Sequence, residues 1–89
     1  MKNKRPAPAK GVLFKSKWKE GIILDVENGN YRFLNKAGGY LWKEMDGKRL
    51  LSEIAGRFSE KYGIPREQAA MDVEQYFEEL RRERFVRFL

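Results

Sequence analysis

Two apolar runs near the start of the chain predict a β-hairpin. The runs Gly21–Val26 and Tyr31–Leu34 flank the segment Glu27–Asn30, which contains the pair Asn28-Gly29. An Asn-Gly pair accommodates the positive φ angles of a tight type I′ turn, whose twist suits two paired strands. We therefore place Asn28-Gly29 at the tip of the hairpin.

This turn sets which residues should pair across the hairpin. The expected pairs are Val26 with Tyr31, Asp25 with Arg32, and Leu24 with Phe33. One face should then carry Leu24, Val26, Tyr31 and Phe33, and the other face Ile23 and Leu34 beside the opposite-charge pair. A first short strand is expected over residues 11–14. Tyr31–Leu34 would then end a three-stranded meander as an edge strand, unless the first strand lies on that side.

Three stretches with helical periodicity follow the hairpin. Asn35 is a candidate N-cap for the first helix, which should stop at Asp46-Gly47. The second helix should end at Gly63, a residue suited to a left-handed C-terminal cap, and the third should run from about Pro65 to Arg82. The apolar stripes are Ala37, Gly38, Leu41, Trp42 and Met45, then Leu51, Ile54, Ala55, Phe58 and Tyr62, then Ala69, Ala70, Val73, Tyr76, Phe77 and Leu80. Close packing would explain Gly38-Gly39 inside the first helix, and residues 85–89 should form a short terminal strand or a docked tail.

Strands followed by three helices predict an α+β fold. We expect a winged-helix-like domain in which a three-stranded antiparallel β-meander precedes three α-helices. With 89 residues the chain is one small domain, and Trp18 and Trp42 are among its bulky candidates for the core. Residues 1–10 are rich in Pro, Ala and Lys without periodicity, so we expect a flexible basic tail there and the folded domain over residues 11–89.

The residue types that are missing argue against an enzyme. The chain has no cysteine, histidine or threonine, and its serines are Ser16, Ser52 and Ser59. Without histidine a serine lacks its usual base, and without cysteine neither a disulfide nor a thiolate metal site can form. The carboxylates fall on predicted helix surfaces, so we expect no catalytic residue, cofactor or metal. No apolar run is long enough to cross a bilayer, and we expect a cytoplasmic monomer without a membrane partner.

The formal net charge of +6 is unevenly distributed along the chain. Residues 1–19 hold seven basic and no acidic residues, whereas residues 20–89 hold twelve basic and thirteen acidic ones. Winged-helix domains often bind DNA through their third helix, which makes a DNA-binding regulator the alternative function. From Pro65 to Leu80, however, this helix carries five acidic residues against Arg66 alone, and it would meet phosphate repulsion. Specific nucleic-acid binding is therefore not expected.

Peptide capture is a second interpretation of the same architecture. An edge strand offers unpaired backbone groups to which an extended peptide can add, and the third helix could form the other wall of a groove. A plainer interpretation assigns the aromatic and aliphatic side chains of this region to the core, where these types are usually buried. The residues concerned are Tyr31, Phe33, Val73 and Tyr76. A third interpretation, a small subunit that docks on a partner protein, overlaps with the second.

An ordered set of short motifs resembles the PqqD family. The motifs are Leu34-Asn35, Gly38, Leu41-Trp42, Asp46-Gly47, Glu53-Ile54, Tyr62, Asp72-Val73 and Leu80. The resemblance covers about residues 21–88. Where the family usually begins its second helix with Thr, three residues before Glu, this chain has Leu50 before Glu53. We expect the capping box to be lost there, at a cost of about 1 kcal/mol.

The resemblance implies a RiPP recognition element, where RiPPs are ribosomally made and post-translationally modified peptides. Such a domain is a non-enzymatic peptide chaperone, which binds the leader of a precursor peptide as a strand added to the third strand, with the third helix alongside. It presents the precursor to a modifying enzyme, a radical S-adenosylmethionine (SAM) maturase as in pyrroloquinoline quinone biosynthesis or a lasso-peptide protease. The peptide-binding residues that it implies are Tyr31, Arg32, Phe33, Leu34, Asp72, Val73, Tyr76 and Glu79.

Overall fold

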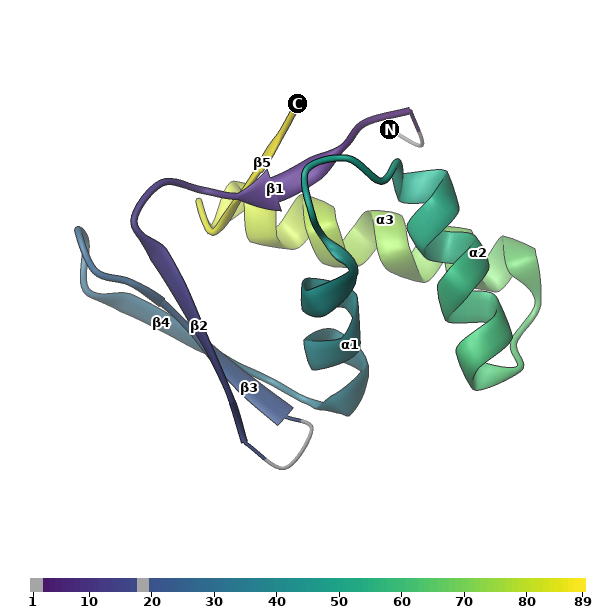
Figure 1. The fold of residues 1–89 in the computed structure, drawn as a ribbon, viewed down its shortest axis with the longest axis horizontal. Helices are drawn as coiled ribbons and strands as arrows, with labels where there is room; N and C mark the ends of the chain where they lie inside the picture. The colour runs from purple at the N-terminus through teal and green to yellow at the C-terminus, as the bar shows by residue number, and fades with distance from the viewer. Residues whose placement is uncertain (1–2, 18–19) are drawn as a thin grey trace.

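The computed structural model of the chain describes residues 3–17 and 20–89. Its elements are β1 (Pro6–Pro8), β2 (Val12–Lys17), β3 (Glu20–Asp25), β4 (Asn30–Leu34), α1 (Lys36–Glu44), α2 (Leu51–Tyr62), α3 (Arg66–Arg82) and β5 (Val86–Phe88) (Figure 1). The expected α+β, winged-helix-like order of a meander followed by three helices is confirmed. Trp18, a candidate for the core, lies outside the described residues, as do the first two residues of the expected tail.

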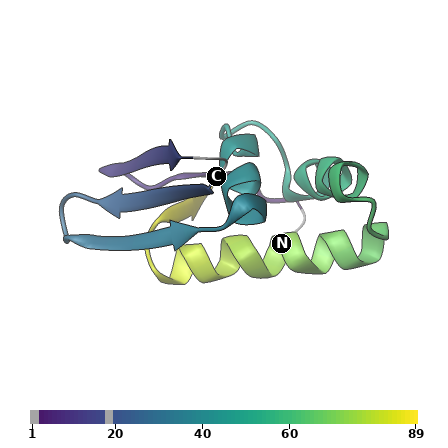
Figure 2. The same cartoon turned by 90° about the horizontal axis from the view of Figure 1, so that it is seen from below.

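The meander forms an antiparallel sheet in the order β2-β3-β4, so β4 is an edge strand as expected. One face of this sheet is covered by α1, which packs against β3 and β4, while α2 packs against α3. Figure 2 shows α3 running along the lower side of the molecule, with α1 and α2 above it and the C-terminal part of β4 above its C-terminal turns. The edge of β4 and the C-terminal half of α3 are thereby brought together.

The pairing of the hairpin differs from the expected pairing by two residues. The observed pairs are Leu24 with Tyr31, Ile23 with Arg32, and Ile22 with Phe33. The predicted pairs, including Asp25 with Arg32, are therefore wrong. The carboxylate of Asp25 instead accepts hydrogen bonds from the backbone N–H groups of Glu27 and Asn28, and these bonds stabilise a loop over residues 26–29 in place of a two-residue turn. Because the shift is an even number of residues, each side chain stays on its expected face.

The expectation of a tail without regular structure is wrong for residues 6–8. Pro6–Pro8 form β1, which pairs antiparallel with β5. The C-terminal residues were expected to form either a short strand or a docked tail, and they form the strand. Pro6 and Ala7 are buried. The carbonyl of Lys4 accepts from the N–H of Leu51 at 2.9 Å, and the carbonyl of Arg5 accepts from the N–H of Leu89 at 2.8 Å. Residues 4–8, called the N-terminal strap below, thus connect the start of α2 with the C-terminus.

The core lies between the inner face of the sheet and the three helices. Its fully buried side chains include Ile23 from β3, Leu51 and Ile54 from α2, and Val73, Phe77 and Leu80 from α3. The expected apolar stripes supply most of this core, but Tyr62, in the expected stripe of α2, is exposed. Ala70, in the expected stripe of α3, is exposed too.

Local capping signals define the helix ends. The side chain of Asn35 accepts a hydrogen bond from the N–H of Gly38 at 2.8 Å, and Gly63 has a φ of 63° at the end of α2, so both expected caps are confirmed. Leu50 cannot cap α2 with its side chain, which is half-buried. Glu53 nevertheless accepts from the N–H of Leu50 at 2.9 Å, so one half of the capping box is kept.

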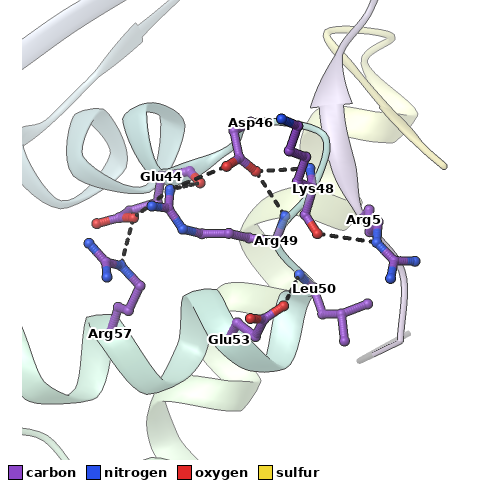
Figure 3. A network of polar contacts seen from close by, with 8 residues as sticks. All are labelled: Arg5, Glu44, Asp46, Lys48, Arg49, Leu50, Glu53 and Arg57. Atoms are coloured by element: carbon purple, nitrogen blue, oxygen red, sulfur yellow. Dashed lines mark hydrogen bonds and ion pairs between the residues drawn. The ribbon is translucent and has the colours of Figure 1, made fainter.

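Polar contacts hold the linker between α1 and α2 (Figure 3). The carboxylate of Asp46 accepts from the N–H groups of Lys48 and Arg49 at 2.9 and 2.8 Å, and Gly47 has a φ of 76°. Asp46-Gly47 therefore ends the first helix as expected. On the other side of the linker, Nε of Arg5 donates to the carbonyl of Lys48 at 3.1 Å and ties the N-terminal strap to it.

Candidate functional site: the groove between β4 and α3

A groove of about 320 Å³ lies where the end of β4 meets α1 and α3. Its lining comes from Arg32–Asn35, from Ala37, Gly38 and Leu41 of α1, from Phe58 of α2, and from Asp72 and Tyr76 of α3. Of the eight residues implied by the family resemblance, five therefore line one groove: Arg32, Phe33, Leu34, Asp72 and Tyr76. One wall of this groove is an edge strand whose outer side has no neighbouring strand among the residues described.

Gly38 and Tyr76 form the floor of the groove. The hydroxyl of Tyr76 donates a hydrogen bond to the carbonyl of Gly38 at 2.7 Å. A Cβ at position 38 would lie 3.4 Å from the ring of Tyr76 and 3.3 Å from the side-chain oxygen of Asn35. The close packing expected at Gly38 is thus observed. Burial raises the pKa of Tyr76 above its ordinary range, so its hydroxyl keeps its proton and stays a donor.

Arg32 joins β4 to α3 by an ion-pair bridge. Its guanidinium contacts both carboxylate oxygens of Glu83, one of them at 2.8 Å, and lies 3.4 Å from the carboxylate of Glu79. The side chains of Arg32, Glu79 and Glu83 are 35%, 45% and 40% exposed. Burial alone would lower the pKa of Arg32, but the hydrogen bonds and charges of Glu83 and Glu79 raise it overall. We call these three residues the Arg32 bridge.

The other implied residues are placed differently. Val73 has no exposed surface and belongs to the core, so its side chain is not available to a ligand. Tyr31 and Phe33 are 61% and 73% exposed, and their rings pack edge to face on the side of β4 that no helix covers. The plainer interpretation, that all four apolar residues of this region are core, is correct for Val73 and wrong for Tyr31 and Phe33.

A row of apolar side chains crosses all three strands on the uncovered face of the sheet. Leu13, Leu24 and Tyr31 stand side by side across β2, β3 and β4. All three are exposed large hydrophobic residues, as are Phe33 and Val26 nearby. A peptide added to β4 would therefore have these apolar side chains beside one of its faces and the groove beside the other. Leu13 was not anticipated from the sequence, because it lies between two other apolar residues, Val12 and Phe14, and this run does not indicate which face each one takes.

The sequence did not assign Glu83, beside the groove, or Gly38, in its lining, to the site. Glu83 follows α3 and meets Arg32 from 51 positions away, so no local pattern could reveal the contact. Asp72 accepts a hydrogen bond from Nε2 of Gln68 at 2.8 Å, and forms no ion pair within the described residues. The groove wall on α3 is thus acidic, with Arg32 as the cation facing it.

The described parts of the chain, residues 3–17 and 20–89, contain no group of three or more acidic residues close enough to hold a metal ion. Among these same residues, no helix combines the length and the apolar character that a membrane crossing requires. The arrangement in the groove is suited to binding, because it offers backbone hydrogen-bonding groups, an apolar floor and charged walls.

Comparisons with known proteins agree with this geometry. The family model for "Coenzyme PQQ synthesis protein D (PqqD)" matches residues 20–86. The structure "TbiB1 in Complex with the TbiA(beta) Leader Peptide" superposes with a TM-score of 0.83 at 18% identity, over 89% of this chain and 92% of that chain. "Lasso peptide synthetase B1 complexed with the leader peptide" superposes with a TM-score of 0.84 at 14% identity, over 93% of this chain and 98% of that chain. A search of curated proteins gave no significant match. At these identities the two structures establish a shared fold.

Proposed function

Because the chain belongs to the PqqD family, we propose that it is a RiPP recognition element, a non-enzymatic protein that binds the leader of a precursor peptide. It presents that precursor to a modifying enzyme. The observation that carries the proposal is the unpaired edge of β4 beside the groove that contains Arg32, Leu34, Asp72 and Tyr76. Both structures with the same fold are described as complexes with a leader peptide, which supports the proposal.

The leader binds by strand addition in this proposal. Its backbone pairs with the free N–H and C=O groups of β4, which gives affinity without regard to sequence. Its side chains point alternately to the two faces of the extended sheet. On one face they enter the groove over Gly38 and Tyr76, and on the other they lie beside Tyr31 and Phe33. The two apolar environments would therefore both contribute to selecting the leader.

The acidic wall of the groove selects for charge. Asp72 and Glu79 stand on α3, on the side that faces the added strand, and they favour a leader with a basic residue near its apolar anchors. Because Asp72 forms no ion pair with other described residues, it offers the more accessible carboxylate. Replacement of Asp72 by Ala should weaken the binding of such a leader, and unchanged affinity would contradict this assignment.

The partner is an enzyme that modifies or cleaves the presented peptide. It is either a radical SAM maturase, as in pyrroloquinoline quinone biosynthesis, or a leader peptidase, as in lasso-peptide biosynthesis. We propose that this protein acts as a cytoplasmic monomer and needs no cofactor. Binding of DNA through α3 is disfavoured by the five acidic residues between Pro65 and Leu80.

Selection of peptides on the purified protein tests this function. A displayed library of random linear peptides, long enough to span β4, should yield binders. Binding of such a peptide should slow hydrogen exchange at the amides of β4 that face solvent, while the amides of β2, at the opposite edge, are unaffected. Two N-methylated versions of the peptide should then be compared, one methylated on its odd-numbered residues and the other on its even-numbered residues. Only one of them should lose binding, because only alternate N–H groups of an added strand face β4.

The contrary outcomes are clear in this design. Failure to select any peptide, or selection of peptides that leave exchange in β4 unchanged, would refute strand addition at this edge. Binding of random duplex DNA with a steep dependence on salt would favour the regulator instead.

A further inference from the structure

The Arg32 bridge divides the junction of β4 and α3 into two depressions. One is the groove described above, and the other is lined by Gly29, Asn30, Tyr31, Glu83 and Phe85. Arg32 stands at the middle of β4, and its guanidinium crosses to Glu79 and Glu83 between them. A peptide that lies along the whole of β4 must therefore pass over this bridge.

We propose that a basic side chain of the bound leader displaces Arg32 from Glu79 and Glu83 and pairs with these two carboxylates in its place. Arg32 would thus be a specificity-determining residue, because it competes with the lysine or arginine of the leader for Glu79 and Glu83. This inference rests on the proposed function, since it concerns the peptide added to β4. The inference differs from the role proposed for Asp72, which lines the groove and takes no part in the Arg32 bridge.

The exposure of the bridge makes the exchange feasible. All three side chains are at least a third exposed, and the contact with Glu79 is long, at 3.4 Å. Ion pairs in such positions contribute little to stability, because water solvates the separated groups nearly as well. Arg32 can therefore turn away into solvent at little cost, and another guanidinium or ammonium group can replace it.

An added strand would place a side chain where this replacement is possible. A residue directly opposite Arg32, on the same face of the sheet, has its Cβ about 5 Å from that of Arg32. Arginine and lysine side chains at this position are as long as Arg32 or nearly so, and they reach the same carboxylates. Glu79 and Glu83 are four residues apart at the C-terminal end of α3 and present one pair of acceptors.

The charges of the bridge favour a basic residue over an acidic one. Two carboxylates face one guanidinium, so the bridge keeps an excess of negative charge even while Arg32 is bound. An acidic leader residue would add a third carboxylate at close range. A basic residue is attracted by this excess of negative charge, and it pairs with Glu79 and Glu83 once Arg32 has turned away.

Binding measurements on matched variants test the inference. The probe is a fluorescent peptide selected on the wild-type protein, in which each residue is replaced in turn by Ala and by Arg. At one position, facing Arg32, the gain in affinity from Ala to Arg should be roughly three-fold larger for Arg32→Gln than for the wild-type protein. The Ala peptide sets the baseline within each protein, so only the ratio of the two affinities is compared, and Glu79→Gln with Glu83→Gln should remove the gain.

Arg82→Gln is the matched control for this measurement. Arg82 lies on the same end of α3, pairs with Glu78 at 3.5 Å and is 71% exposed, so its loss changes the net charge equally without touching the bridge. It should behave as the wild-type protein does. This control separates competition at the bridge from a general change in the field of the protein.

The outcomes distinguish this inference from the proposed function. If Arg32 only braces β4 against α3, Arg32→Gln will weaken the Ala and Arg peptides alike, and the inference is overturned while peptide binding stands. The inference is overturned in the same way if Arg32→Gln and Arg82→Gln increase affinity for the Arg peptide equally. If no selected peptide engages β4, the proposed function fails and the inference fails with it.

Discussion

Two clusters of arginine and glutamate in this molecule have the same chemistry and different surroundings. The first, which we call the Glu44 cluster, joins Glu44 of α1 to Arg49 of the linker and Arg57 of α2 (Figure 3). The second is the Arg32 bridge between β4 and α3. The Glu44 side chain is 9% exposed and accepts from Nε of Arg57 at 2.8 Å, whereas every member of the Arg32 bridge is at least 35% exposed.

The burial of the carboxylate decides what each cluster can do. Glu44 has little access to water, so it depends on its arginine partners for hydrogen bonds, and it fixes α1, the linker and α2 relative to one another. Arg49 also donates to the backbone carbonyl of Glu44 at 3.0 Å, which adds to this connection. In the Arg32 bridge, water can replace any partner. The first cluster therefore serves the fold, and the second is free to serve binding.

Removal of one charge from each cluster should give the largest contrast. Glu44→Gln keeps the shape of the side chain but weakens its bonds to Arg49 and Arg57, and should lower the free energy of unfolding by about 2 kcal/mol. Arg32→Gln should lower it by less than about 1 kcal/mol, because the bridge is exposed. Urea denaturation followed by circular dichroism measures both. Equal losses for the two variants would contradict the distinction between the clusters.

Acid should reveal the same contrast more gradually. Burial alone would raise the pKa of Glu44, but hydrogen bonds from Arg57 and Tyr40 and the charges of Arg57 and Arg49 lower it overall from the ordinary value of 4.5. A carboxyl group with a lowered pKa in the folded state contributes stability above pH 4.5, and this contribution is lost as the pH falls through the folded-state pKa. The gap in stability between the wild-type protein and Glu44→Gln should therefore narrow below pH 4.5. A gap that stays constant down to acid unfolding would show that the charge of Glu44 is unimportant.

The sequence predicted those features of the fold that depend on neighbouring residues. Asn35 caps α1 and Gly63 ends α2 because a single side chain or a single φ angle suffices. The register of the hairpin was missed because the choice between turn lengths depends on the Asp25 carboxylate, which binds the loop and not Arg32. The strand at Pro6–Pro8 was missed because its partner, β5, lies at the other end of the chain.

The site was predictable in outline but not in detail. Alternation along Tyr31–Leu34 indicates two faces, and the composition of α3 indicates an acidic wall. Both faces of β4 carry apolar residues, however, so alternation cannot tell that helices cover Leu34 and leave Phe33 in solvent. The Arg32 bridge depends on how α3 passes β4, which is a property of the packed molecule.

The smallest expected effect on stability comes from replacing Arg5 of the N-terminal strap. Figure 3 shows Arg5 in the same view as the Glu44 cluster, so an exposed contact and a buried one can be compared there. Arg5 lies at the exposed edge of this network, where its Nε donates to the carbonyl of Lys48 at 3.1 Å. The strap is held mainly by other contacts, since Pro6 and Ala7 are buried and backbone bonds join it to Leu51 and Leu89. Arg5→Ala should therefore lower the free energy of unfolding by about 0.5 kcal/mol at most, because water replaces the lost bond. Urea denaturation and hydrogen exchange at the Leu89 amide measure the effect. A loss as large as that of Glu44→Gln would mean that exposed side-chain contacts hold the strap, and burial would no longer separate the two kinds of cluster.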